Sequence, residues 1–177
     1  MSRSWLPATG AAVAAAIAIG CGGVEGPPTT VVDADSADQI VFGLDHIITT
    51  SGVLRVRVEA DTAFFYASTQ RFELRQMKVI FYNTVGIESS TLTAQEGTYY
   101  SNNGNMEARI DVVGVTPDGR RLTTTKLTYN RLSDQLRSTD PFVFDSPEEH
   151  LEGDGFTSDP DFQDVQATSI RGGVRNQ

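Results

Sequence analysis

The side chains that could do chemistry in this chain are few, and the two histidines are the first candidates. His46 lies in an apolar run and His150 follows two glutamates, so the two are far apart in the sequence. Neither has a second histidine or a cysteine at the spacing that a zinc site requires. We therefore interpret both as edge or turn residues rather than as metal ligands or catalytic bases.

Carboxylates cluster in the last third of the chain, and carboxylate oxygens are the ligands that Ca²⁺ prefers. A calcium loop, however, places its ligands at every second position around a central glycine, and that order is missing here. The two glycines at 153 and 155 do not form a phosphate loop, because no strand-to-helix transition or lysine follows them. We interpret as a solvated loop the cluster of Asp145, Glu148, Glu149, Glu152 and Asp154.

Nucleophilic catalysis has no recognisable machinery in this sequence. There is no Gly-x-Ser-x-Gly motif, which would place a serine on a sharp strand-to-helix turn. The single cysteine is Cys21, which we expect to be consumed by processing. No nucleophile and base can be paired from what remains. The sequence therefore predicts no enzyme, no catalytic residue, no metal and no cofactor.

The surroundings of Cys21 indicate export and anchoring. A short stretch rich in alanine and isoleucine, from Leu6 to Ile19, precedes it. This stretch is too short to span a bilayer of ~30 Å, and it fits the apolar region of a secretory signal. Small residues directly before a cysteine match a bacterial lipobox. We expect a lipoprotein signal peptide over residues 1–20 and a lipidated Cys21 that holds the chain at a membrane. The alternative is a plain signal peptide cleaved near a cysteine.

The remainder of the chain has the pattern of an all-β domain. Residues 21–38 lack periodicity and are expected to form a flexible linker. From residue 39 onward, apolar and polar residues alternate in short runs such as Leu54–Ala60, with asparagine, glycine, aspartate or proline between the runs. The apolar phase slips between Leu74 and Met77, which suggests a β-bulge. We predict one β domain over residues 39–170, no helix after the signal, and a disordered tail over residues 171–177.

A short sequence repeat begins with leucine and threonine and ends with threonine and tyrosine. It recurs at intervals of roughly 30 residues, which is typical of supersecondary units that stack on one another. Its copies begin at Leu92 and Leu122, and a weaker one at Leu151. Stacked units bring apolar side chains into one inner stripe. The stripe is either the core alone or the lining of an open groove for an acyl chain. The groove candidates are Val56, Val58, Phe64, Leu92, Tyr99, Met106, Ile110, Leu122, Leu127, Tyr129 and Phe156.

The charge of the chain excludes one class of function. The 177 residues carry a formal net charge of −9. A protein that neutralises nucleic-acid phosphates needs a basic face, so we expect no nucleic-acid partner.

Eight short motifs, from Val58-Glu59-Ala60-Asp61 to Leu151-x-Gly153-x-Gly155-Phe156, together make the chain similar to a known family, the LptC family of lipopolysaccharide-export proteins. The resemblance extends from about Gln39 to Thr168, and the order and spacing of the motifs are more specific than any one of them. The motifs are Val58-Glu59-Ala60-Asp61, Phe72-x-Leu74, Val79-x-Phe81-Tyr82, Leu92-Thr93-Ala94, Met106-Glu107-Ala108-Arg109, Asp118-Gly119-x-x-Leu122, Leu127-x-Tyr129 and Leu151-x-Gly153-x-Gly155-Phe156.

The resemblance implies a fold, a transport role and partners. It implies an open, twisted antiparallel β-jelly roll like that of LptA and of the N-terminal part of LptD. Such domains stack edge to edge and carry lipopolysaccharide from an inner-membrane ABC transporter of the LptB2FG type to an LptA-like bridge protein. The implied place is the periplasmic face of the inner membrane. LptC proteins usually carry a transmembrane helix where this chain has its lipobox, so a lipid would replace the helix as the tether.

Exposed sheet edges are templates for pairing with another chain. We expect the N-terminal edge to face the transporter and the C-terminal edge to add a strand from the LptA-like protein. The second interpretation is a structural envelope lipoprotein that links proteins through these edges and has a closed core. The edge candidates are Ile40, Phe42 and Ile47 at the N-terminal edge and Phe162, Val165 and Ile170 at the C-terminal edge.

Overall fold

The computed structural model describes residues 37–175. The expected signal peptide, Cys21 and the linker up to residue 36 lie outside the described residues. The described residues form ten β-strands and no helix, as the alternating pattern predicts. The strands are β1 (Gln39–Thr50), β2 (Val53–Tyr66), β3 (Arg71–Tyr82), β4 (Glu88–Tyr100), β5 (Met106–Val115), β6 (Arg121–Asn130), β7 (Gln135–Asp145), β8 (Glu149–Ser158), β9 (Gln166–Ala167) and β10 (Ile170–Arg175).

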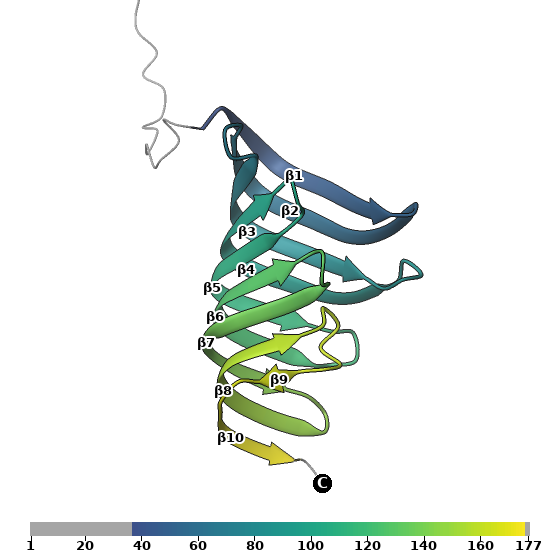
Figure 1. The fold of residues 1–177 in the computed structure, drawn as a ribbon, viewed down its shortest axis with the longest axis vertical. Coiled ribbons are helices and arrows are strands. Elements are labelled where there is room, and N and C mark those ends of the chain that lie inside the picture. Colours follow the sequence, from purple (N-terminus) through teal and green to yellow (C-terminus); the bar gives the residue numbers. More distant parts are fainter. Residues whose placement is uncertain (1–36, 176–177) are drawn as a thin grey trace, which may run out of the picture. The chain divides into compact units, whose positions relative to one another are not determined.

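All ten strands belong to one open antiparallel sheet (Figure 1). Strands β1 to β8 pair in sequence order, β10 pairs with the outer side of β8, and the short β9 also pairs with β8. Tight turns join the consecutive strands, and they lie where the sequence places asparagine, aspartate and glycine. Gly104 and Gly119 have φ angles of +76° and +92° in two of these turns, a conformation that residues with a Cβ rarely adopt.

The C-terminal residues differ from expectation. We expected residues 171–177 to be a disordered tail, but β10 extends to Arg175 and pairs with β8 through residues 170 and 172–175. The prediction is wrong for residues 171–175, and residues 176 and 177 lie outside the described part. The physical reason is that main-chain hydrogen bonds, which need no apolar periodicity, hold this strand to its neighbour.

The long strands change the phase of their inward side chains near their midpoints, and this bends the sheet. Leu74 and Met77 are both buried although three positions separate them, and Gln76 between them has a positive φ of 51°. The register of β3 with β2 and with β4 does not shift at this point, so the change of phase is a bend at Gln76 and not the β-bulge that was predicted. In β5, Ile110 and Asp111 both have positive φ, and the pairing with β6 shifts at the same point. The row of such irregularities forms a corner along which the sheet folds (Figure 1).

The corner divides the sheet into two facing walls. The first wall comprises the strand halves that contain Val58, Val79 and Leu122, and the second comprises the halves that contain Leu74, Tyr99 and Leu127. Aromatic pairs connect the walls. The ring centroids of Phe81 and Tyr129 are 5.0 Å apart, and those of Phe142 and Phe156 are also 5.0 Å apart. The hydrophobic core therefore lies between the two walls of a single folded sheet.

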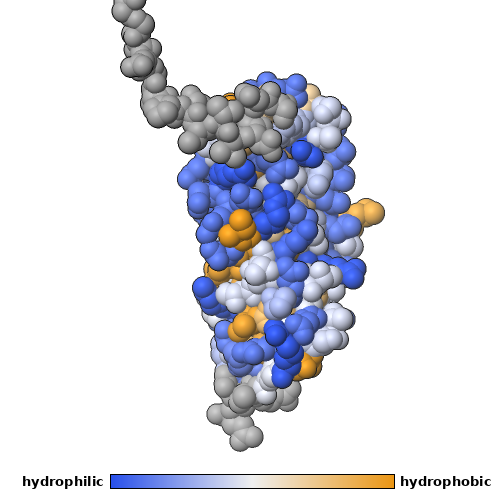
Figure 2. Space-filling view, turned by 90° about the vertical axis from the view of Figure 1, so that its left-hand side faces the viewer, coloured by the Kyte–Doolittle hydropathy of each residue, from blue (hydrophilic) through white to orange (hydrophobic). Residues whose placement is uncertain are grey.

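The outer face of the sheet is polar. Arg109 lies among acidic side chains of three neighbouring strands, with its guanidinium nitrogens 2.8 Å from Glu107 and 3.1 Å from Glu73. Arg57 similarly donates two hydrogen bonds to Asp45 across β1 and β2. The face that Figure 2 shows is mainly hydrophilic, with only scattered apolar side chains. Most of the large apolar side chains of this sheet thus point inward, and charge pairs cover much of its outside.

Candidate functional site

The interior between the walls holds most of the predicted groove residues. Nine of the eleven candidates have relative exposures of 5% or less, and they come from both walls. Their inward orientation follows from the two-residue period of each strand half. The nine residues are Val56, Val58, Leu92, Tyr99, Met106, Leu122, Leu127, Tyr129 and Phe156.

Two groove candidates lie elsewhere, and both are corrections to the sequence analysis. Phe64 belongs to the outer face: its neighbour Ala63 is fully buried, and the Arg75 guanidinium lies 5.9 Å from the Phe64 ring centroid. Ile110 lies at the corner with a φ of 65° and is 46% exposed. In both cases the bend interrupts the alternation of inward and outward side chains on which the prediction depended. The side chain that the alternation would place inside therefore points outward.

Opposite the corner, the walls end in turns that face one another, and we call this opening the mouth. A hollow of about 490 Å³ lies there, lined by Asn83 and Thr84 from one rim and by Arg131 and Asp134 from the other. Arg55 of β2 forms an ion pair of 3.3 Å with Asp134. This pair connects the two rims across the hollow.

Tyr129 joins the apolar interior to this ion pair. Its hydroxyl donates a hydrogen bond of 2.8 Å to Asp134, and burial followed by this hydrogen bond raises the pKa of Tyr129 well above its usual range. The phenol therefore stays neutral and acts as a donor at physiological pH. The contacts of Asp134 with Arg55 and with the Tyr129 hydroxyl thus close this part of the mouth, and the Tyr129 ring lies beneath them.

The segment that joins β8 to β9, residues 159–165, lies inside the mouth; we call it the plug loop. Asp159 organises it by accepting hydrogen bonds from the backbone N–H groups of Gln163 and Asp164 at 2.9 and 3.1 Å. The Ser90 hydroxyl of β4 donates to the carbonyl of Pro160 at 2.5 Å, which ties the loop to the first wall. At the centre of the loop, Phe162 is only 2% exposed and belongs to the core.

The plug loop corrects two of the predicted edge residues. Phe162 and Val165 were expected at the C-terminal sheet edge, but neither lies in a strand. Phe162 is buried, and Val165 is half-buried against the core. The proline at 160 ends the strand pattern, and the apolar side chains that follow gain free energy by leaving water for the interior. The signal in the sequence is Asp159-Pro160, which marks the end of a strand but does not indicate that the loop after it turns inward.

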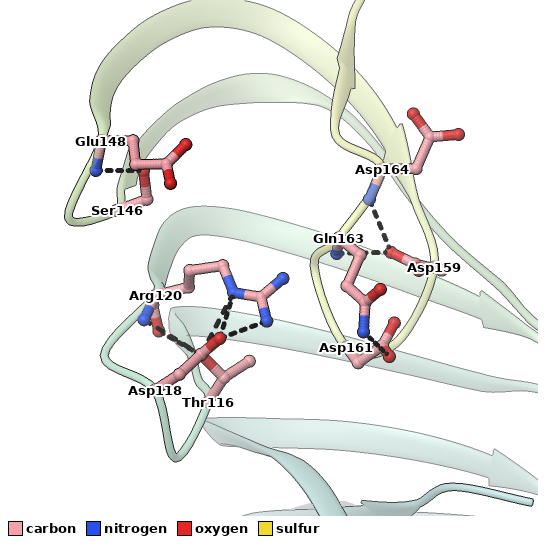
Figure 3. A network of polar contacts seen from close by, with 9 residues as sticks. All are labelled: Thr116, Asp118, Arg120, Ser146, Glu148, Asp159, Asp161, Gln163 and Asp164. Carbon is pink, nitrogen blue, oxygen red and sulfur yellow. Dashed lines mark hydrogen bonds and ion pairs between the residues drawn. The ribbon is translucent and has the colours of Figure 1, made fainter. Parts of the chain in front are cut away.

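Acidic side chains of the plug loop face Arg120 of the turn between β5 and β6 (Figure 3). Burial and the neighbouring Asp159 raise the pKa of Asp161 to about 6. In that turn, hydrogen bonds from Arg120 and Thr116 lower the pKa of Asp118 to about 2. Among residues 37–175, no group of three or more histidine, cysteine or carboxylate side chains is arranged to hold a metal ion. Arg120 and Asp118 pair within their turn, and Asp159 accepts hydrogen bonds within the plug loop, so these charges stabilise the conformations of the two segments.

Both histidines were expected at an edge or in a turn; His46 lies on an edge strand, whereas His150 lies within β8 and pairs with residues of both β7 and β10. His46 is on β1, the first strand of the sheet, and its Nε2 lies 3.0 Å from the Tyr99 hydroxyl. His150 is near the start of β8, and its Nδ1 lies 2.5 Å from Asp145, which raises the pKa of His150. The C-terminal carboxylates do not converge on a common point in the described structure.

The remaining edge candidates lie on the outermost strands. β1 and β10 each have one hydrogen-bonded neighbour in the described sheet. Ile40, Phe42 and Ile47 of β1 are 43%, 78% and 55% exposed, and Ile170 of β10 is 67% exposed. Large apolar side chains on free edge strands are features of surfaces that pair with other chains. In the described range, no helix has the length and hydropathy needed to cross a bilayer.

Fold and interior together define a class of protein: an open β-jelly roll with an apolar interior and two free edges. A model of the family described as "Lipopolysaccharide-assembly, LptC-related" matches residues 11–166. The chain therefore belongs to this family, and the resemblance stated from its motifs is confirmed.

A solved structure shares the fold. It is LptH of Pseudomonas aeruginosa, described as the LptA homologous periplasmic component of the lipopolysaccharide transport device. The two are 18% identical, with a TM-score of 0.52, and the match covers 69% of this chain and 94% of LptH. A search of curated proteins finds no match.

Proposed function

We propose that this protein receives lipopolysaccharide from an inner-membrane ABC transporter and passes it to an LptA-like bridge protein. The observation that carries the proposal is the row of nine inward apolar side chains between two walls, in a sheet whose first and last strands each have a single partner strand among residues 37–175. Acyl chains would lie against this row, while the headgroup would remain at the mouth. Membership of the lipopolysaccharide-assembly family supports the same role. In this role the protein is a transport component and not an enzyme.

Anchoring is the next part of the proposal. A lipidated Cys21 would hold the domain at the periplasmic face of the inner membrane, because several acyl chains on one residue anchor a protein stably. Mass spectrometry of the membrane-extracted protein tests this directly. An N-terminal segment that is still intact through residue 20, or an unmodified Cys21, would contradict it.

The lipid path is tested with a photo-crosslinking amino acid of aromatic shape, benzoylphenylalanine, in the full chain in its native host. Tyr99 and Tyr129 are inward sites, at 4% and 5% exposure, and Phe64 is an outward site of similar size on the same sheet. We expect lipopolysaccharide adducts at Tyr99 and Tyr129 and none at Phe64. Equal adducts at all three sites, or adducts at Phe64 alone, would refute a path between the walls.

The polarity of the assembly is tested with the same chemistry at the edges. A crosslinker at Phe42 on β1 is expected to capture a transporter subunit, and one at Ile170 on β10 is expected to capture the LptA-like protein. The physical basis is that each edge strand has a row of main-chain groups free to pair with another strand. If the two sites capture the partners in the opposite order, the polarity proposed here is reversed.

A second candidate function is favoured by one observation, the close packing of the interior. Val58, Leu122 and Phe156 have no exposed surface, so the described conformation offers no open channel beside them. A structural adaptor that links envelope proteins through its edges needs no channel. Protein adducts at the edges without any lipopolysaccharide adduct at Tyr99 or Tyr129 would support the adaptor.

A further inference from the structure

Phe162 occupies the interior in a manner unlike the other buried aromatic residues. The buried residues Phe81, Phe142 and Phe156 extend from strands of the two walls, but Phe162 enters from the plug loop. Its φ angle of 53° is in the left-handed region, which is unfavourable for a bulky side chain. Such a conformation persists only where surrounding contacts hold it.

The space that the Phe162 ring occupies exists because residue 114 is a glycine. A Cβ atom added to Gly114 of β5 would lie 2.4 Å from the far end of the Phe162 ring. Gly114 pairs with Leu92 and with Leu122, two of the predicted groove residues on either side. The missing side chain therefore opens a recess in the inner stripe, and the ring of Phe162 fills it.

Two hollows meet at the plug loop. Its residues Asp159, Pro160 and Asp161 line the hollow of about 490 Å³ at the mouth. Its residues 162–165 line a second hollow of about 760 Å³, together with Phe144 and Arg120. Both volumes are within the range of about 300–1,000 Å³ that ligand sites usually have. The plug loop is the partition between the two hollows.

The partition is held mainly by polar contacts rather than by strand pairing. It is tied through the Ser90 hydroxyl and through the Asp159 carboxylate, and its apolar anchors are Phe162 and the half-buried Val165. Loops with few apolar anchors open at a lower free energy than the strands around them. An apolar ligand that takes the place of the Phe162 ring would restore most of the apolar burial that is lost when the loop opens.

We propose that the recess beside Gly114 is a binding position for one acyl chain of a glycolipid, and that Phe162 occupies it as an internal plug when no lipid is present. Displacement of the plug loop joins the two hollows at the mouth and opens a path from their polar rims to the apolar recess between the walls. The inference rests on the proposed transport function. It explains how an interior that is fully packed at Val58 and Leu122 accepts a lipid.

The test measures how removal of the plug changes lipid capture by the full chain in its native host. Benzoylphenylalanine at Tyr129, which lines the mouth hollow, reports lipopolysaccharide adducts. Phe162→Ala removes the ring, and Gly114→Ala pushes the ring out of its recess without altering the loop. If the plug is closed in about 90–99% of molecules, its removal raises apparent affinity by about 10–100-fold. We therefore expect Phe162→Ala to increase the adduct yield several-fold, and Gly114→Ala to increase it less, because its methyl group occupies the recess that the acyl chain needs.

Leu74→Ala is the matched control, because Leu74 is fully buried in the same interior but lines neither hollow. It is expected to lower stability without increasing the yield. An unchanged or lower yield in Phe162→Ala, at normal protein levels, would overturn the plug, as would an equal increase in Leu74→Ala. Adducts in the parent chain would still support the transport function in that case. The absence of adducts in every variant would instead contradict the transport function itself.

A measurement on the unsubstituted chain avoids any effect of the substitutions on folding. The backbone N–H groups of residues 162, 163 and 164 all donate to Asp159 in the closed loop. These bonds lie within the plug loop, and contacts of the buried ring hold the left-handed φ of Phe162 on which the turn depends. When lipopolysaccharide displaces the ring in the purified full chain, the turn should relax, and hydrogen exchange of these three amides should accelerate by several-fold. Exchange that slows or stays the same while lipopolysaccharide is bound would show that the loop remains in place, and it would refute the plug.

Discussion

Truncation of Leu127 tests whether the interior is packed closed, as the structure shows it, or is an open groove. Leu127 is 1% exposed between the two walls. A leucine that is truncated to alanine in a packed core loses both transfer free energy and the contacts around the new cavity, and the cost is about 3–4 kcal/mol in a rigid site. In an open groove the side chain would already be partly hydrated, and the cost would be about 1 kcal/mol.

Urea denaturation of the full chain, followed by circular dichroism, measures this difference. With a slope of about 2 kcal/mol per molar for a domain of this size, a loss of 3–4 kcal/mol lowers the midpoint by about 1.5–2 M. Leu132 is the matched control, because it is 98% exposed at the turn after β6, and Leu132→Ala should stay within about 0.5 kcal/mol of the parent. A midpoint change below about 0.5 M for Leu127→Ala, or equal changes for the two variants, would refute the packed interior.

Three further predictions concern other parts of the fold. Gly97→Ala should lower the free energy of unfolding by about 1–3 kcal/mol, because the new Cβ would lie 2.0 Å from the Met77 sulfur and 3.1 Å from the carbonyl oxygen of Glu107; no loss in urea denaturation would contradict this packing. Because burial raises the pKa of Asp161 to about 6 in the folded protein, from 3.8 in the unfolded chain, its contribution to stability is fully present below pH 3.8 and is lost as pH rises through 6. Asp161→Asn should therefore flatten the urea midpoint between pH 4 and pH 7, and a midpoint that falls with pH as steeply as in the parent would refute this assignment. Arg109→Met should cost about 1 kcal/mol or less at physiological salt and more at low salt, because its ion pairs are partly exposed and screened; a cost independent of salt would show that packing dominates.

The class of the fold is well predicted because strand alternation and turn residues are local signals. The runs around Val56 and Met106 alternate with a period of two, and the asparagine and glycine between runs mark the turns. The recurrence at Leu92 and Leu122 is explained by the structure, since these residues begin corresponding stretches of β4 and β6, separated by one hairpin. The same periodicity places nine of the eleven groove candidates on the inside.

The predictions from the sequence are wrong where contacts between residues distant in the sequence override the local pattern. The bend at Gln76 is visible in the sequence as a slip in the apolar phase, although no extra residue is inserted there. The bend at residues 61 and 62 reverses the orientation expected for Phe64 without any comparable slip in hydrophobicity. The segment that contains Phe162 and Val165 has the composition expected of an edge strand. Whether such a segment pairs at an edge or folds into the interior depends on whether a space exists for it, and that space is made by residues far away in the sequence.

By itself, the sequence determined an acidic, all-β chain of stacked hairpins with an apolar inner stripe, because charge, period and turn chemistry are read from adjacent residues. Only the tertiary structure decided that the stripe is closed. The corner brings the two walls together, Gly114 leaves a recess in the first wall, and Phe162 reaches it from a loop that follows β8. No local pattern contains that contact, because the free energy of filling a cavity exists only after both of its sides are in place.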